Sequence, residues 1–159
     1  MGMFQYKTEQ FLPIDIEEAW QFFSSPKNLA TITPADLDFK ILSNLKDEEI
    51  YEGMKIDYVV KPLLKIPMHW QTEIIKVSRG KFFTDRQLKG PYKIWEHTHI
   101  FKNLADGVLM QDIINYQLPF GIIGNIAHSL LVKKKIENIF SYRRNVLEKI
   151  FITNEHIFN

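Results

Sequence analysis

Apolar and polar residues alternate along much of the chain between Leu37 and Leu118, in runs that are separated by Gly or Pro. Alternation with a period of two is typical of β-strands, and short connections that contain Gly or Pro favour antiparallel hairpins. The pattern predicts six strands, at Asp38–Leu45, Lys55–Leu63, Met68–Ser78, Phe82–Lys89, Tyr92–Asn103 and Val108–Leu118. An earlier run, Met3–Leu12, predicts a further strand that Pro13 ends.

Two short helices are predicted directly after this first strand. Asp15 is a suitable N-cap for the first helix, which ends near Ser24. Pro26 is suited to the first position of the second helix, and Pro34 then directs the chain toward a strand. We expect Trp20 to pack the first helix into the core.

Beyond Pro119 the apolar residues recur at helical spacing as far as Phe151, which predicts one long C-terminal helix. Its apolar stripe comprises Ile123, Ile126, Ala127, Leu130, Val132, Ile136, Ile139, Phe140, Val146, Leu147, Ile150 and Phe151. A curved seven-stranded antiparallel sheet buries such a stripe when the helix lies across one face, and a cavity can remain between the two. The predicted fold is α+β, with residues 1–159 forming one domain.

Composition narrows the possible functions. The 159 residues are 45% hydrophobic and 25% charged, which is typical of a globular domain. The net charge of +1 does not favour nucleic acid as a partner, and the absence of Cys excludes thiol catalysis and cysteine-bound zinc. Lysines interrupt the most apolar stretch, and no secretory signal is apparent, so we expect no membrane span and a cytoplasmic location. A monomer or a homodimer is expected.

Two stretches of sequence resemble a known superfamily. The first is Trp20-Gln21-Phe22-Phe23-Ser24-Ser25-Pro26, followed by Asn28-Leu29 and Ile32-Thr33-Pro34. The second runs from Asp85-Arg86-Gln87 through Gly90-Pro91-Tyr92, Trp95-Glu96-His97-Thr98-His99-Ile100-Phe101 and Met110-Gln111-Asp112 to Tyr116-Gln117-Leu118-Pro119-Phe120-Gly121. Both are similar to small bacterial members of the helix-grip, or SRPBCC, superfamily of START-like, birch-pollen-allergen-type and polyketide cyclase/dehydrase proteins. The resemblance implies a helix-grip fold with a cavity for an apolar ligand.

One face of the predicted strand Tyr92–Asn103 carries Trp95, His97, His99 and Phe101, because residues two apart share a face. Large rings on both sides of a histidine pair are typical of a cavity wall, so we expect this face to point inward. The neighbouring strands offer matching side chains. The predicted ligand-binding residues are Trp70, Phe83, Asp85, Gln87, Trp95, His97, His99, Phe101, Met110, Asp112 and Tyr116.

Four interpretations of Asp85, His97, His99 and Asp112 are open. They form a buried network that orients the polar end of an apolar ligand, since buried polar groups need partners. Alternatively, His97 and Asp112 are an acid/base pair for enolisation, cyclisation or dehydration. In the third interpretation His97 and His99 bind a metal, together with one or both acids. The fourth is a purely structural network.

The first interpretation is favoured. It predicts a binding or carrier protein for a small hydrophobic ligand, such as a lipid, sterol, quinone or polyketide-like molecule, with no resident cofactor. A cyclase/dehydratase-type enzyme and a protein-interaction module are the alternatives. The sequence has no Gly-rich phosphate loop and no nucleophile elbow, which argues against nucleotide hydrolysis and acyl-enzyme chemistry.

Overall fold

The computed structural model describes residues 2–45, 49–62, 66–119 and 131–153. A seven-stranded antiparallel sheet has the strand order β1-β7-β6-β5-β4-β3-β2. Its strands are β1 (Phe4–Leu12), β2 (Lys40–Ile41), β3 (Lys55–Val60), β4 (Met68–Ser78), β5 (Phe82–Lys89), β6 (Ile94–Leu104) and β7 (Gly107–Gln117). The helical elements are α1 (Ile16–Phe23), α2 (Pro26–Thr31), η1 (Ala35–Leu37), α4 (Lys133–Glu148) and the π-helical turn η3 (Lys149–Thr153). The predicted α+β architecture is confirmed.

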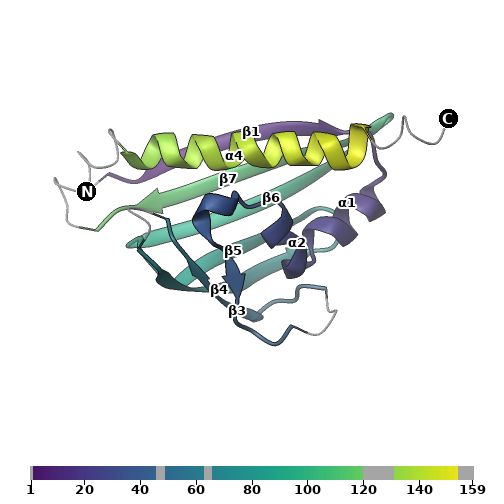
Figure 1. Ribbon diagram of the computed structural model, residues 1–159. Coiled ribbons are helices and arrows are strands. Elements are labelled where there is room, and N and C mark those ends of the chain that lie inside the picture. Colours follow the sequence, from purple (N-terminus) through teal and green to yellow (C-terminus); the bar gives the residue numbers. More distant parts are fainter. Residues whose placement is uncertain (1, 46–48, 63–65, 120–130, 154–159) are drawn as a thin grey trace.

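The helices of the described ranges lie on one face of the sheet (Figure 1). Helix α4 runs along β1 and β7, while α1 packs against β6 and β7 and α2 approaches β2. The register of β6 and β7 is fixed along their length, because the two strands pair continuously from Ile94↔Gln117 to Leu104↔Gly107. Side chains that alternate toward the helices on β4, β5 and β6 therefore face a shared interior.

The first helix forms where local capping predicts it. The Asp15 carboxylate accepts a hydrogen bond from the Glu18 backbone N–H, 2.8 Å away. Trp20 is fully buried, and its ring meets those of Phe83 and Phe101 edge to face, with centroids 6.0 and 5.7 Å apart. The prediction that this tryptophan anchors the helix in the core is confirmed.

The edge strand near residue 40 is much shorter than the predicted Asp38–Leu45. Asp38 follows η1 with a positive φ of 44°, a left-handed conformation that is incompatible with a strand. The backbone N–H groups of Leu42 and Ser43 both donate to the Asp57 carbonyl, so the regular ladder ends at Ile41.

Two other predicted strand boundaries differ from the structure by more than one residue. The strand predicted to begin at Tyr92 begins at Ile94, because the Tyr92 N–H donates to the Gln87 side-chain oxygen. The strand predicted to reach Leu63 ends at Val60, and Leu63 itself lies outside the described residues.

The C-terminal helix buries the predicted apolar stripe from Val132 onward, with Ile136, Phe140 and Leu147 all buried. The first part of the predicted stripe, Ile123 to Leu130, lies outside the described residues. The stripe also contains one charged residue, Arg143, which is buried one helical turn from Phe140. Within the described ranges, no helix is both long and apolar enough to cross a membrane.

The packing of α4 on the sheet predicts a large effect of Leu147→Ala. Leu147 is 0% exposed, so its truncation should lower the free energy of unfolding by about 2–5 kcal/mol. Leu131 is 59% exposed, and Leu131→Ala should change the same quantity by less than about 0.5 kcal/mol. Urea denaturation of the two variants measures the difference. Equal losses would contradict the packing described here.

Candidate functional site

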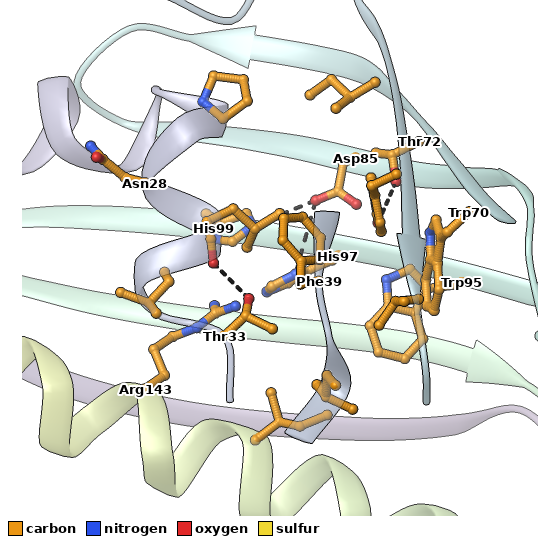
Figure 2. A pocket seen from close by; sticks show the side chains of 18 of the residues that line it. Asn28, Thr33, Phe39, Trp70, Thr72, Asp85, Trp95, His97, His99 and Arg143 are labelled. Atoms are coloured by element: carbon orange, nitrogen blue, oxygen red, sulfur yellow. Dashed lines mark hydrogen bonds and ion pairs between the residues drawn. The ribbon is translucent and has the colours of Figure 1, made fainter. Parts of the chain in front are cut away.

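A cavity of ≈ 190 Å³ lies between the sheet and the helices (Figure 2). Its wall is formed by α1, α2, η1, the four strands β3 to β6, and α4. Aromatic rings supply much of this wall: Phe22, Phe23, Phe39, Tyr58, Trp70, Phe83, Tyr92, Trp95 and Phe140. Neighbouring rings pack against one another, as in the perpendicular pair Trp70 and Trp95, whose centroids are 5.4 Å apart. The cavity is therefore mainly apolar.

A polar group interrupts the apolar wall where β5 and β6 pair. Asp85 lies opposite His97 in the ladder, and His99 follows two residues later on the same face of β6. All three side chains line the cavity, with His97 and His99 only 6% and 8% exposed. The structure thus places the histidine face of β6 inward.

Asp112 holds both histidines from the adjacent strand, β7. Its Oδ1 accepts a hydrogen bond from His97 Nε2 at 2.7 Å. The same oxygen lies 3.1 Å from His99 Nδ1, an ion-pair distance at which the two groups are not aligned as a hydrogen bond. Asp112 lies opposite His99 in the ladder and does not line the cavity, so it positions the histidines from the neighbouring strand.

The charges in this group are strongly coupled. Burial raises the pKa of the Asp112 carboxyl, but the two histidines outweigh that effect and hold its pKa well below the usual range. Burial and the neighbouring His99 charge lower the pKa of His97. Burial also opposes charge on His99, yet the carboxylates of Asp112 and Asp85 outweigh it and raise the pKa of His99. The histidines therefore differ: His97 is neutral at neutral pH, and His99 is the one that carries a proton more readily.

Arg143 is a cavity-lining residue that the sequence analysis does not identify. Its side chain extends from α4 toward the same end of the cavity, and the residue is only 7% exposed (Figure 2). Nη1 lies 3.5 Å from Asp112 Oδ1, and the guanidinium carbon lies 4.6 Å from the centre of the Phe140 ring. Neither Nε nor Nη1 has a hydrogen-bond partner. The sequence signal that could identify Arg143 is its position as a charged residue within the apolar stripe of the helix.

The structure divides the predicted ligand-binding residues into two groups. The residues that line the cavity are Trp70, Phe83, Asp85, Trp95, His97 and His99. The residues that do not line it are Gln87, Phe101, Met110, Asp112 and Tyr116.

The residues of the second group make contacts elsewhere in the structure. Phe101 and Met110 belong to the core beneath α1, and Tyr116 packs in a separate buried cluster with Phe140. The Gln87 side-chain amide donates to the Tyr92 carbonyl at 2.6 Å and so ties the turn between β5 and β6.

The orientation of the His97 ring decides which chemistry is available at the cavity wall. Because His97 Nε2 bonds to Asp112, its other ring nitrogen, Nδ1, is the one nearer Asp85, at 3.9 Å from Oδ2. A carboxylate that fixes one imidazole nitrogen leaves the other as a proton acceptor or a ligand. The arrangement can therefore accept a hydrogen bond, move a proton or bind a cation.

Comparison with solved structures identifies the architecture. Ginseng major latex-like protein 151 from Panax ginseng superposes with a TM-score of 0.68 at 13% identity, over 94% of this chain and 98% of that chain. Ara h 8.0201 gives a TM-score of 0.58 at 11% identity, over 93% and 99% of the two chains. The chain has the helix-grip fold.

A bacterial helix-grip structure shows a similar likeness. A protein from Chromobacterium violaceum superposes with a TM-score of 0.69 at 10% identity, over 92% of this chain and 96% of that chain. No family model matches the sequence, and no curated protein matches it. At these identities the likeness is one of fold, and the site is understood from its own residues.

The Asp112 network predicts a pH-dependent effect of Asp112→Asn. The folded-state pKa is depressed, so the carboxylate stabilises the protein above the ordinary Asp pKa, and this stabilisation is lost as pH falls through the folded-state pKa. At pH 7 the variant should lose about 3 kcal/mol in free energy of unfolding, because Arg143 and the histidines lose their buried partner. The deficit should shrink below about pH 4.

Asp57→Asn is the matched control, because Asp57 pairs with His69 on an exposed part of β3 and β4. Removal of this exposed pair should cost less than about 1 kcal/mol in the same urea titrations. If Asp112→Asn cost no more than Asp57→Asn at pH 7, the buried network would not have the importance assigned to it.

Proposed function

We propose that the protein binds a small, mainly apolar molecule between the sheet and α4. The observation that carries this proposal is an aromatic-lined cavity whose wall includes buried hydrogen-bond donors that no protein atom satisfies. Ligand sites in proteins are typically apolar clefts with a few placed polar groups. The fold also supports the proposal, because helix-grip neighbours indicate a hydrophobic ligand-binding scaffold.

The cavity volume limits the size of the ligand. An engineered apolar cavity of about 150 Å³ accepts benzene. A cavity of ≈ 190 Å³ therefore favours a molecule of one or two rings over a complete sterol or a two-chain lipid. Trp70, Trp95 and Phe83 present ring faces and edges to such a molecule, so an aromatic ligand suits this wall best. This refines the broad ligand class expected from the sequence.

The unsatisfied donors define the polar part of the ligand. Arg143 Nε and Nη1 and Trp70 Nε1 are buried without hydrogen-bond partners, although Nη1 lies 3.5 Å from Asp112 Oδ1. Each such group costs about 1–3 kcal/mol until it finds an acceptor. A carboxylate suits the planar guanidinium best, because two of its N–H groups can bind both oxygens. We therefore infer an aromatic or alicyclic acid whose carboxylate faces Arg143, with Asp85, His97 and His99 beside it.

Binding of two probes tests this proposal. 2-Naphthoate has two rings and a carboxylate, and 2-naphthalenemethanol has the same rings without the charge. Titration of each probe into the protein should quench the fluorescence of Trp70 and Trp95, which line the cavity. Arg143→Met should weaken 2-naphthoate binding by about 10–100-fold, the value of a hydrogen-bonded charged group, and leave binding of the alcohol nearly unchanged.

Three further variants serve as controls for this experiment. Lys135→Met removes another cavity-lining cation, one that already pairs with Asp36 at 2.6 Å, and should leave the preference for naphthoate intact. Ile56→Phe fills the cavity and should abolish binding of both probes, whereas Ile100→Phe, on the opposite face of the sheet, should not. Binding of both probes that survives Ile56→Phe would place the ligand elsewhere.

A further inference from the structure

We propose that Asp85, His97 and His99 form a binding site for a divalent first-row transition metal ion, of the zinc or iron(II) type, that opens into the cavity. The site is a property of the protein wall itself and does not depend on the presence of an apolar ligand. Three features support this site: three donor atoms converge, a carboxylate on the neighbouring strand orients the histidines, and the local charge is negative.

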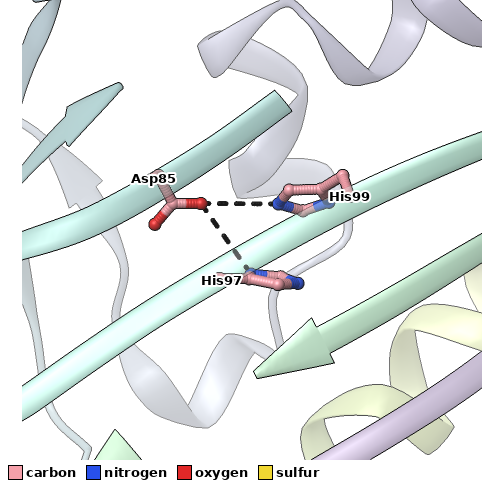
Figure 3. A group of neighbouring side chains, drawn as sticks. All are labelled: Asp85, His97 and His99. Carbon is pink, nitrogen blue, oxygen red and sulfur yellow. Dashed lines mark ion pairs between the residues drawn. The ribbon is translucent and has the colours of Figure 1, made fainter. Parts of the chain in front are cut away.

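The three donor atoms converge on one point (Figure 3). Asp85 Oδ2 lies 3.5 Å from His99 Nε2 and 3.9 Å from His97 Nδ1. One donor atom from each residue lies within 4.8 Å of the other two. Bonds of about 2.0–2.1 Å to a tetrahedral ion place its ligands about 3.4 Å apart. The observed separations are too long for good direct hydrogen bonds but need only small side-chain shifts to surround an ion.

Asp112 supplies the second feature of a metal centre. Metal-bound histidines almost always bind a carboxylate or carbonyl through their other ring nitrogen, which fixes ring orientation and raises basicity. Here the single Asp112 Oδ1 lies 2.7 Å from His97 Nε2 and 3.1 Å from His99 Nδ1. The nitrogens that face Asp85 are therefore the ones left over for an ion. Within the described ranges, no three acidic or histidine side chains outside this network gather in this way.

The donor set and the surroundings indicate the class of ion. Two imidazoles and one carboxylate match the three protein ligands of catalytic zinc sites and of non-haem iron(II) sites. All three residues line the cavity, so the remaining coordination positions face a space that a ligand or water can enter. This geometry resembles an open site more than a closed structural one.

The local charge also favours a dication. With neutral histidines, Asp85 and Asp112 contribute two negative charges, and Arg143 is the buried cation that offsets one of them through its 3.5 Å approach to Asp112.

Titration of metal-stripped protein with Zn²⁺ and Co²⁺ tests the site. Calorimetry should show one tight Zn²⁺ site per chain, and bound Co²⁺ should give the visible absorption of a low-coordinate nitrogen and oxygen site. Asp85→Asn and His99→Gln should abolish this site. Asp112→Asn keeps all three ligands and should weaken affinity by about 10–100-fold at unchanged stoichiometry, as expected for an orienting carboxylate.

His69→Gln is the matched control, because His69 pairs with Asp57 on the exposed part of β4, away from the cavity. It should leave binding unchanged. Asp85→Asn is nearly isosteric, so it also tests the site should His99→Gln not fold. The proposal would be overturned if the unaltered chain bound no metal. It would also be overturned if binding survived Asp85→Asn or were lost in His69→Gln. The naphthoate titration should be carried out on the same metal-stripped protein, so that failure of either proposal is visible separately.

Discussion

A carboxylate that is buried beneath an apolar cavity requires nearby donors and positive charge, because its removal from water is otherwise too costly. Asp112 on β7 meets this requirement through His97 and His99 on β6 and Arg143 on α4. These three contacts join the centre of the sheet to the helix that covers it. They also decide which nitrogen of His97 faces the cavity. The arrangement of the polar wall therefore depends on this one carboxylate.

The apolar packing around the cavity and the buried polar side chains beside it have opposite effects on stability. Trp20, Phe83 and Phe101 pack edge to face or stacked under α1, so that part of the interior is held by aromatic contacts. Near α4, by contrast, Arg143 has two buried nitrogens, Nε and Nη1, that make no hydrogen bond. Such a position reduces stability unless something binds there, because each unsatisfied donor has lost its water. Natural interiors retain these groups chiefly where they serve binding or chemistry.

Much of the fold is predictable from the sequence because its signals are local. Period-two alternation and Gly- or Pro-containing turns predict the long central strands, and alternation also places His97 and His99 on one face. The short edge strand was overestimated, because the left-handed conformation of Asp38 depends on the η1 turn that precedes it.

The candidate site was only partly predictable. Residue alternation identifies which strand residues share a face, but it does not say how deep each lies. Hence Phe101 and Met110 were assigned to the cavity wall although they lie in the core. Arg143 required knowledge of how the helix is rotated about its axis over the sheet, which no local pattern gives. The position of Arg143 within an apolar stripe indicates a buried charge, but the sequence does not say which residue that charge would contact.

Nitrogen-15 NMR of the two histidine rings tests the central claim most directly, because ring shifts report both the tautomer and the protonation of each residue. The account predicts that His97 stays neutral with its proton on Nε2 at neutral pH, while His99 retains a proton to higher pH than an ordinary histidine. Two rings that titrate alike near the ordinary pKa of about 6.5, or a His97 ring with its proton on Nδ1, would contradict it.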